Sequence, residues 1–369
     1  MKIQIVLPLD FRHPIGGYAV AYEYANQLEA RGHDLEVVHL QPDRWQRLRE
    51  HPRSELRQEL RLRRRGPEWY SLSCRVRVRT VRALGRSTRT ADVVLATAWQ
   101  TAEAVVRSGV ELPRGYYLIQ HDEVWSGDPE RVHKTWRLPL TKIVISGWLA
   151  ELAASLDAGQ VHQIANGIDT TVFRERTPEA SRPAASVAMM WHEASWKASE
   201  VGLSALRTVK ERRPDLRVQL FSVYERPADL PNWVDWRSGV RGASLAGLYN
   251  ECAVFVSPSL SEGWPLPPAE AMASGCCLVS TDIPGVADYA HQDRTALLAP
   301  AGDAEALAET VFGVIEDDAT RLRVAEAGQR LIHEEFSWER AAARLEALLL
   351  DVPGRHPEVS ATTLIIPES

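Results

Sequence analysis

Two glutamates, Glu262 and Glu270, stand eight residues apart in the stretch SLSEGWPLPPAEAMASG, which covers residues 259–275. A carboxylate can accept hydrogen bonds from two hydroxyl groups at once, so each acid could hold a sugar-like diol. Proline is favoured at the start of a helix because its missing N–H would have no partner there. We therefore expect Pro267 or Pro268 to begin a helix that Gly275 ends, with Glu270 in its first turn and Glu262 in the preceding loop.

The loop between these two acids could also bind an anion. Its prolines stiffen it, and the remaining N–H groups of Gly263, Trp264 and Leu266 can converge on one negatively charged group. The positive end of a helix dipole lies at the same place. A nucleotide diphosphate would fit there, with Glu270 on the ribose hydroxyls and Glu262 on those of an attached sugar. From spacing alone, the alternatives are a helix-capping glutamate and a surface acid.

The composition of the chain indicates a globular protein of two domains. Its 369 residues exceed one typical domain, and 45% apolar with 25% charged residues is ordinary for this class. No apolar run approaches the roughly 18 residues of a membrane helix, and residues 1–11 predict a first strand rather than a signal peptide. The four cysteines match neither a disulfide framework nor a zinc pattern, which favours a reducing cytoplasm.

One segment of the chain is strongly basic. From Arg44 to Arg89 there are fifteen arginines and four acidic residues, in a chain whose net charge is -6. Such a segment could meet an anionic acceptor or the phospholipid surface at the inner face of the membrane, and the alternative is a solvated helical face. No nucleic-acid-binding motif accompanies the charge, so we expect no nucleic-acid partner.

The order of the expected strands and helices predicts an α/β fold. Short apolar runs alternate with stretches of helical periodicity, and a stretch at 166–186, rich in proline, threonine and charge, separates two such alternations. We expect two Rossmann-like, doubly wound domains that face each other across a cleft, with ligands at the carboxyl ends of the strands. The expected strands are 2–7, 34–40, 91–98, 115–120, 141–146, 187–190, 217–223, 253–259 and 276–281, and helices begin near 16, 147, 198, 243, 267, 303, 318 and 337.

The stretch SEGWPLPPAEAMASG closely resembles the Glu-x7-Glu signature of glycosyltransferase family 4, whose members are retaining enzymes with the two-domain GT-B architecture. Other stretches follow in the order that this family has them, including the Gly16–Gly17 loop, SGWLAE, NGIDTTVF and FSWERAAARLEALL. The similarity extends from Met1 to about Leu350. The first strand and turn lack G-x-G-x-x-G, which counts against a dinucleotide oxidoreductase.

This resemblance implies a division of the chain into functional parts. Residues 1–170 would form an N-terminal, acceptor-binding Rossmann-like domain, and residues 171–335 a C-terminal Rossmann-like domain that binds the nucleotide sugar. Residues 336–352 would form a C-terminal helix that closes the fold and packs back toward the N-terminal domain. Residues 353–369 would form a loose tail.

The resemblance also implies roles for individual residues. Glu270 matches the ribose-binding acid, Glu262 the acid that holds donor-sugar hydroxyls, and Lys197 the lysine that neutralises the departing diphosphate. His121 occupies the place of a histidine that faces the donor sugar, and completes the implied catalytic set with Lys197 and Glu262. Further implied donor-binding positions are Gly16, Gly17, Val240, Arg241, Gly263, Trp264, Pro265 and Leu266.

Two positions depart from the family pattern. The family usually has an arginine five or six residues before the lysine, where this chain has Trp191 and His192. The lysine is usually followed by glycine, and here the next residue is Ala198. A second positive charge on the diphosphate would then come from Arg12 or Arg241, unless one cation suffices.

Three further motifs have weaker readings. A metal site formed by acids and the histidine of HDEVWSGD, residues 121–128, is conceivable, although the family generally needs no metal. Ser146 is expected to cap a helix.

Among twelve tryptophans, those in the expected site loops could stack on sugar rings and others are expected in packing. The first group is Trp125, Trp191, Trp196 and Trp264, and the second is Trp148, Trp233 and Trp236.

The sequence thus leads us to expect a cytoplasmic, retaining glycosyltransferase that moves a sugar from a nucleotide-diphospho-sugar to a hydroxyl acceptor. The acceptor would be a saccharide, a lipid-linked saccharide or a small molecule, and the resemblance implies no metal and no cofactor beyond the nucleotide sugar. Peripheral membrane contact would use Arg44–Arg89. The alternatives are a nucleotide-sugar 2-epimerase of the same architecture and a non-catalytic subunit that binds the donor and docks a partner.

Overall fold

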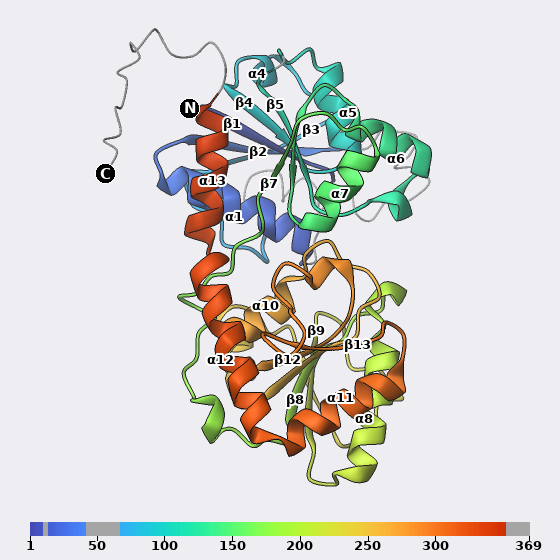
Figure 1. Ribbon diagram of the computed structural model, residues 1–369. Helices are drawn as coiled ribbons and strands as arrows, with labels where there is room; N and C mark the ends of the chain where they lie inside the picture. Colours follow the sequence, from blue (N-terminus) through green and yellow to red (C-terminus); the bar gives the residue numbers. More distant parts are fainter. Residues whose placement is uncertain (10–13, 42–66, 112, 352–369) are drawn as a thin grey trace, which may run out of the picture.

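The chain folds into two lobes, each built on a parallel β-sheet (Figure 1). The computed structural model describes residues 1–9, 14–41, 67–111 and 113–351. Within these residues the first sheet has the strand order β3-β2-β1-β4-β5-β6-β7, and the second has the order β10-β9-β8-β11-β12-β13. In each sheet the chain first adds strands on one side of the domain's first strand and then adds the remaining strands on its other side. Doubly wound nucleotide-binding folds have the same arrangement. The predicted pair of Rossmann-like domains is therefore confirmed.

The first sheet is covered by helices on both faces. Its central strand has the sequence KIQIVL, and such a run of buried, β-branched residues suits a parallel strand that is covered on both sides. The strands are β1 (Lys2–Leu7), β2 (Asp34–Leu40), β3 (Arg77–Val81), β4 (Val93–Ala96), β5 (Gly115–Ile119), β6 (Thr141–Val144) and β7 (Val161–Gln163). The helices are α1 (Gly16–Ala30), α4 (Arg86–Arg89), α5 (Trp99–Arg107), η1 (Val124–Ser126), α6 (Pro129–Trp136) and α7 (Gly147–Ser155).

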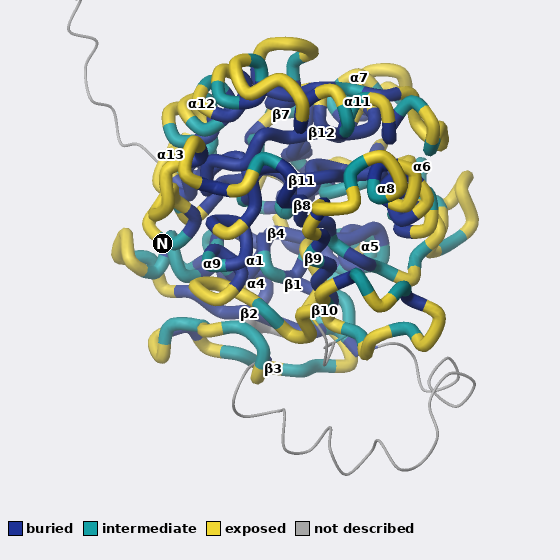
Figure 2. The backbone as a smooth tube through the Cα atoms, turned by 90° about the horizontal axis from the view of Figure 1, so that it is seen from below, coloured by how far each residue is buried: buried dark blue, intermediate teal, exposed yellow. Residues whose placement is uncertain are grey.

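The second sheet repeats this arrangement. Figure 2 shows its central strands, and those of the first sheet, buried, whereas the edge strands β3 and β10 are more exposed. The strands are β8 (Ser186–Met190), β9 (Arg217–Ser222), β10 (Val234–Ser238), β11 (Val254–Ser257), β12 (Cys277–Thr281) and β13 (Leu297–Ala299). The helices are η2 (Glu179–Ser181), η3 (Ser195–Lys197), α8 (Ser199–Arg212), α9 (Ala243–Glu251), α10 (Leu266–Ala273), η4 (Pro284–Val286), α11 (Ala304–Glu316), α12 (Asp318–Glu335) and α13 (Trp338–Leu350).

Helix α13 runs beside the first domain, although it follows the second domain in sequence (Figure 1). The ring of Trp338 meets that of Tyr24 in α1 edge-to-face, with ring centroids 5.2 Å apart. At the other end of α13, the Glu346 carboxylate pairs with Arg31 at 3.0 Å and with the ring of His33 at 2.7 Å. The domain boundaries expected from the sequence stay a prediction.

The basic segment has partners inside the first domain where the structure describes it. Arg77 and Arg79 lie on strand β3 and pair with Asp34 at 2.9 Å and Glu36 at 2.6 Å on β2. The alternative of a solvated helical face is therefore wrong for residues 77–81, because these residues form an edge strand. Residues 42–66 of the segment, Arg12 and the expected tail lie outside the described residues. In the described ranges, no helix combines the length and apolar character needed to cross a bilayer.

Candidate active site

A small cavity marks the point where the strand order of the second sheet reverses. It lies at the carboxyl ends of β8 and β11, the neighbouring strands whose connections run to opposite sides of the sheet. Its volume is about 10 Å³, space for about one water molecule. Lys197 and Glu262 line it, together with Met190, Ser259 and the prolines at the start of α10.

Lys197 and Glu262 form an ion pair beside this cavity. The Nζ of Lys197 lies 2.6 Å from Oε1 of Glu262, and both side chains are largely buried. The Ser259 hydroxyl donates to the same carboxylate oxygen at 2.8 Å. The sequence places these residues 65 positions apart, and the fold brings them together because each follows the carboxyl end of an adjacent strand. Lys197 is the cation that the described chain sets against Glu262.

Helix α10 begins earlier than the sequence predicts. Its first residue is Leu266 and Pro265 is its N-cap, so two prolines occupy the second and third helical positions. Those positions also lack an intrahelical acceptor for an N–H, which is why proline is tolerated there. Glu270 is consequently in the second turn of α10, and its expected place in the first turn is wrong. The helix ends as predicted before Gly275, whose φ of +88° suits glycine.

Glu270 is half-buried on α10 and is held by a residue of a neighbouring helix. The hydroxyl of Tyr249 in α9 donates to its Oε2 at 3.3 Å. Burial raises the pKa of Glu270 to about 7, and the Tyr249 hydrogen bond opposes this rise. A carboxyl group poised near neutrality beside the site can accept hydrogen bonds from a ligand once it is ionised.

At Gly263 the backbones of the two domains pass close to each other. A Cβ added at Gly263 would lie 1.9 Å from the backbone oxygen of Gln120, so only glycine fits. The indole Nε1 of Trp148 in α7 donates to the Gly263 carbonyl at 2.9 Å. The side chain of Gln120 in turn donates to the Gly17 carbonyl at 3.0 Å. Gln120, which the sequence analysis missed, therefore contacts both Gly17 and the Gly263 loop.

His121 follows Gln120 at the carboxyl end of β5. Its Nδ1 lies 3.1 Å from the carbonyl oxygen of Asp122 and must donate to it, because a carbonyl only accepts, which leaves Nε2 as the acceptor. Burial lowers the pKa of His121, while the Glu262 carboxylate raises it and Lys197 lowers it further. The ring is therefore neutral at neutral pH, and it shares the electrostatic environment of the ion pair.

Other expected site residues lie outside this group. Gly16 begins α1, and a Cβ there would meet open space. Val240 packs against the core, and exposed Arg241 has its guanidinium 3.5 Å from the carbonyl of Trp69. In the described structure neither Val240 nor Arg241 makes a hydrogen bond or ion pair with Lys197 or Glu262.

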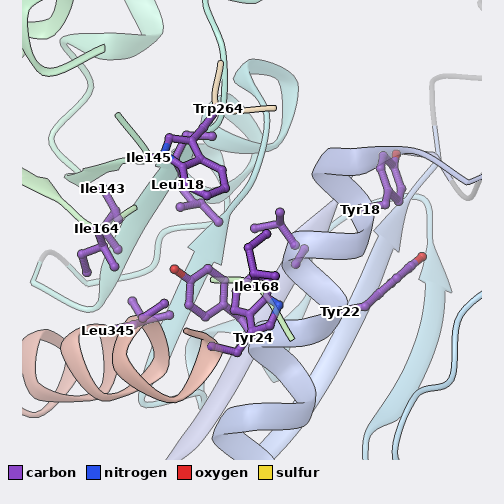
Figure 3. Packing of buried hydrophobic residues seen from close by; sticks show 14 of the residues in the cluster. Tyr18, Tyr22, Tyr24, Leu118, Ile143, Ile145, Ile164, Ile168, Trp264 and Leu345 are labelled. Atoms are coloured by element: carbon purple, nitrogen blue, oxygen red, sulfur yellow. The ribbon is translucent and has the colours of Figure 1, made fainter. Parts of the chain in front are cut away.

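The side chain of Trp264 points into the core. It is only 4% exposed and meets the ring of Tyr289 at 4.9 Å, and Figure 3 shows it beside Ile145 and Leu118. Trp191 is also buried, at 7% exposure. The expectation that these two rings stack on a sugar is therefore wrong, because their faces are occupied. The backbone N–H of Trp264 remains a candidate donor to an anion.

The two departures from the family pattern have structural counterparts. His192 accepts a hydrogen bond from the Ala194 N–H at 3.0 Å through Nδ1, and burial followed by the Lys197 charge lowers its pKa. It is therefore neutral, and it does not replace the absent arginine. Ala198 has φ +48° and ψ +38°, the left-handed region that favours glycine. The chain holds an alanine in a conformation for which glycine is the ordinary residue.

The conceivable metal ligands of residues 121–128 have separate partners. Asp122 pairs with His133 at 3.0 Å, Glu123 accepts from the backbone N–H of Trp99 at 2.8 Å, and Asp128 caps α6. These contacts draw the acidic side chains toward different elements of the first domain. The arrangement fits loop anchoring rather than a shared ligand set.

The cap of α7 comes from the other domain. The hydroxyl of Ser146 is buried and has no hydrogen-bond partner in the described structure, so its expected capping role is wrong. The carboxylate of Asp288 accepts from the Gly147 N–H instead, at 3.3 Å and 3.4 Å. Trp148, expected only in packing, also bonds across the interface. Neither Asp288 nor Trp148 carries a local sequence signal for such a contact.

Two facing Rossmann-like domains, with candidate residues at the carboxyl ends of both sheets, define the GT-B architecture. Residues 184–317 match the family model described as glycosyl transferases group 1. Over 217 residues the chain is 28% identical to the alpha-maltose-1-phosphate synthase of Mycolicibacterium smegmatis, a match that covers 51% of this chain and 56% of that protein. The chain spans about half the length of the curated relatives it matches.

Solved structures resemble nearly the whole chain. Sucrose-phosphate synthase from Thermosynechococcus elongatus has a TM-score of 0.73 at 17% identity, with 94% of this chain and 97% of that chain covered. Anabaena HepE, solved in complex with UDP, has a TM-score of 0.72 at 16% identity, with 95% and 100% covered. At these identities the likeness establishes the fold.

Proposed function

We propose that this protein is a retaining glycosyltransferase that transfers a sugar from a nucleotide-diphospho-sugar to a hydroxyl acceptor, in glycan, glycolipid or glycosylated small-molecule synthesis. The observation that carries the proposal is the Lys197–Glu262 pair, 2.6 Å apart, at the switch point of the second sheet. The group 1 match over the same domain supports it. The UDP bound by HepE supports a nucleotide donor in this fold.

The proposed roles follow from the charges and donors around the cavity. Lys197 exchanges its contact with Glu262 for the diphosphate and stabilises the negative charge that grows as the sugar departs. The N–H of Leu266, the first residue of α10, has no intrahelical acceptor and can donate to the same anion. Glu262 then accepts hydrogen bonds from hydroxyls of the donor sugar, and Glu270 from those of the ribose.

The proposed transfer breaks the bond between the anomeric carbon and the phosphate oxygen and forms one to the acceptor oxygen on the same face. The acceptor proton passes to the departing phosphate oxygen. Neutral His121 faces the donor sugar and accepts a hydroxyl hydrogen bond through Nε2. Contact between the domains at Gly263 keeps water from the activated sugar.

A thermal-shift screen with UDP-, GDP- and dTDP-sugars tests donor binding, because a ligand that binds the native state raises the midpoint. The preferred donor is then incubated with saccharide acceptors, and NMR gives the anomeric configuration of the product. Retention of the donor's configuration is expected, and inversion would contradict the mechanism. Epimerised nucleotide sugar formed without acceptor would favour the 2-epimerase, and binding with neither transfer nor hydrolysis would favour a non-catalytic subunit.

We propose that the transfer needs neither a metal nor a further cofactor. Lys197 and the positive end of the α10 dipole supply the positive potential that the diphosphate requires. Exhaustive treatment with EDTA should leave the transfer rate unchanged. A loss that added Mg²⁺ or Mn²⁺ restores would contradict this part of the proposal.

The cytoplasmic location and the peripheral membrane contact also stay proposals. Residues 42–66 of the basic segment lie outside the described residues, and Arg75 pairs with Glu29 at 3.2 Å. Binding to vesicles that contain anionic phospholipid should fall between low and physiological salt. No binding at low salt would contradict membrane contact.

A further inference from the structure

Two exposed tryptophans, one from each domain, meet beside the candidate site. Trp125 is 53% exposed in η1, and Trp196 is 39% exposed in η3. Their ring centroids lie 5.9 Å apart with 31° between the ring planes, which is direct aromatic contact. Trp196 immediately precedes Lys197, and the ring of His121 meets Trp125 edge-on at 4.4 Å. The pair thus adjoins both sides of the candidate site.

The loop that carries Trp125 is firmly anchored. The Glu123 carboxylate accepts from the backbone N–H of Trp99 at 2.8 Å, and the Ser126 hydroxyl accepts from the Trp99 indole at 2.9 Å. A Cβ on Gly127 would lie 2.7 Å from the Trp99 ring, so the chain passes close against it. Trp125 is therefore presented to solvent by a backbone that is fixed on both sides of it.

Trp196 is also held by its backbone. Its carbonyl accepts from the N–H of Leu260 at 2.7 Å, which ties η3 to the loop that leads to Glu262. Leu260 is itself 44% exposed. Large apolar side chains that gather on a surface mark binding sites more often than single ones do. An aromatic surface on fixed backbone loses little conformational entropy when a ligand covers it.

We infer that Trp125 and Trp196 form the acceptor subsite and bind the C–H face of a saccharide ring. This inference rests on the proposed function, in which the donor sugar lies at Glu262. An attacking hydroxyl must then approach beside Lys197 and Glu262, and the two indoles border that approach. A sugar ring has an apolar face and a polar rim, which match an indole face bordered by the neutral imidazole of His121.

Saturation-transfer NMR can test this contact without knowledge of the natural acceptor. The probes are methyl α-mannoside, methyl β-glucoside and maltose, each added to the full chain with saturating UDP. Ring C–H signals of at least one probe are expected in the parent protein. Trp125→Ala and Trp196→Ala should weaken that binding about threefold to tenfold, and Trp125→Phe less. Leu350→Ala, an exposed apolar change on α13, should leave it unchanged.

Several results would overturn the inference. One is the absence of ring-proton signals from every probe in the parent. Another is equal binding by the parent and both alanine variants, with their fold verified by circular dichroism. A third result would come from octyl glucoside, used as a probe below its critical micelle concentration. If only its alkyl protons showed saturation transfer, the surface of Trp125 and Trp196 would bind an apolar aglycone and not a sugar ring.

A separate titration keeps this inference distinct from the proposed function. Nucleotide-sugar binding is measured by calorimetry on the same parent protein without acceptor. Donor binding without saccharide contact at the indoles would overturn the inference and leave the proposed function standing. The absence of any nucleotide-sugar binding would overturn both.

Discussion

Lys197 stands at the centre of the candidate site, and its contact with Glu262 suits a residue that exchanges partners. A compact ammonium group can move from a carboxylate to a departing diphosphate without a large rearrangement. Lys197→Ala should lower kcat by about 100-fold, more than it raises the KM for the donor, because in the proposed transfer the charge that Lys197 neutralises grows in the transition state. Steady-state kinetics with the preferred nucleotide sugar measures both constants.

The control for this substitution is Lys134→Ala. Lys134 forms an exposed ion pair with Glu130 on α6, so its removal tests the general loss of one positive charge. Its kinetics should match those of the parent. Equal effects of Lys197→Ala on kcat and on donor affinity would instead assign Lys197 to ground-state binding.

Glu270 gives the donor affinity a predicted pH dependence. Its pKa is raised to about 7 by burial, so the carboxyl is mostly protonated near pH 6 and mostly ionised near pH 8. In the proposed complex two ribose hydroxyls donate to this carboxylate and favour its ionised form, so binding would release a proton. Affinity for the nucleotide sugar should therefore rise between pH 6 and pH 8, as measured by calorimetry. Glu270→Gln should remove this slope, and a slope unchanged in Glu270→Gln would contradict the ribose assignment.

Tyr249 allows a second check of the same carboxyl group. Its hydroxyl donates to Glu270 and lowers the pKa of that group, so Tyr249→Phe should move the midpoint of the affinity profile to higher pH.

The raised pKa of Glu270 also makes the stability of the fold depend on pH. The folded state holds the proton to a higher pH than the unfolded chain, so the contribution of Glu270 to stability falls as the pH rises from about 4.5 to about 7.

Among the elements, those with strong local patterns were predictable. The buried strand β1 follows from its apolar run. The helix α1 follows from its apolar periodicity and from Gly32, whose φ of +90° lies just beyond the last helical residue, Ala30. The strands β3, β7, β10 and β13 were missed because they are short, or lie at a sheet edge where polar residues are tolerated. The start of α10 was misplaced because proline is allowed at several positions of a first turn.

Part of the site could be predicted and part could not. The resemblance located Glu262 and Lys197, and the fold brings them together. Gln120 and Trp148 were missed as site residues because their role depends on contacts with the other domain. The Trp148–Gly263 hydrogen bond joins residues 115 positions apart, and no local periodicity encodes such a pair.

The junction between η3 and α8 contains the strained Ala198. A left-handed conformation costs a residue with a side chain roughly 1–2 kcal/mol, whereas glycine adds about 0.5–1 kcal/mol of entropy to the unfolded chain. Ala198→Gly should therefore raise the free energy of unfolding by about 0.5–1 kcal/mol, measured by urea denaturation. Ala343→Gly, in the ordinary helical interior of α13, should lower it by about 1 kcal/mol. Equal losses in both variants would show that Ala198 is not strained.

At the scale of the whole molecule, the two domains are joined by more than apolar packing. The core cluster of the first domain continues through Trp264 and Tyr289 of the second domain to Trp338 of α13. Directional contacts across the same interface include the Trp148–Gly263 hydrogen bond and the Asp288 cap of α7. The Trp148–Gly263 contact lies in the loop that leads from Glu262 to α10, so in the proposed function the strength of the interface would set how readily a donor enters.

Asp288 offers a test of this interface because its capping contact can be removed with a matched control. Its carboxylate accepts from the Gly147 N–H across the interface, whereas Asp303 caps α11 within its own domain by accepting from Glu305 and Ala306. Each aspartate-to-alanine change should lower stability by about 0.5–2 kcal/mol. Only Asp288→Ala should also increase the radius of gyration of the ligand-free protein in X-ray scattering, because of the two caps only that of Asp288 crosses the domain interface. An identical scattering profile in both variants would mean that apolar packing alone keeps the domains closed.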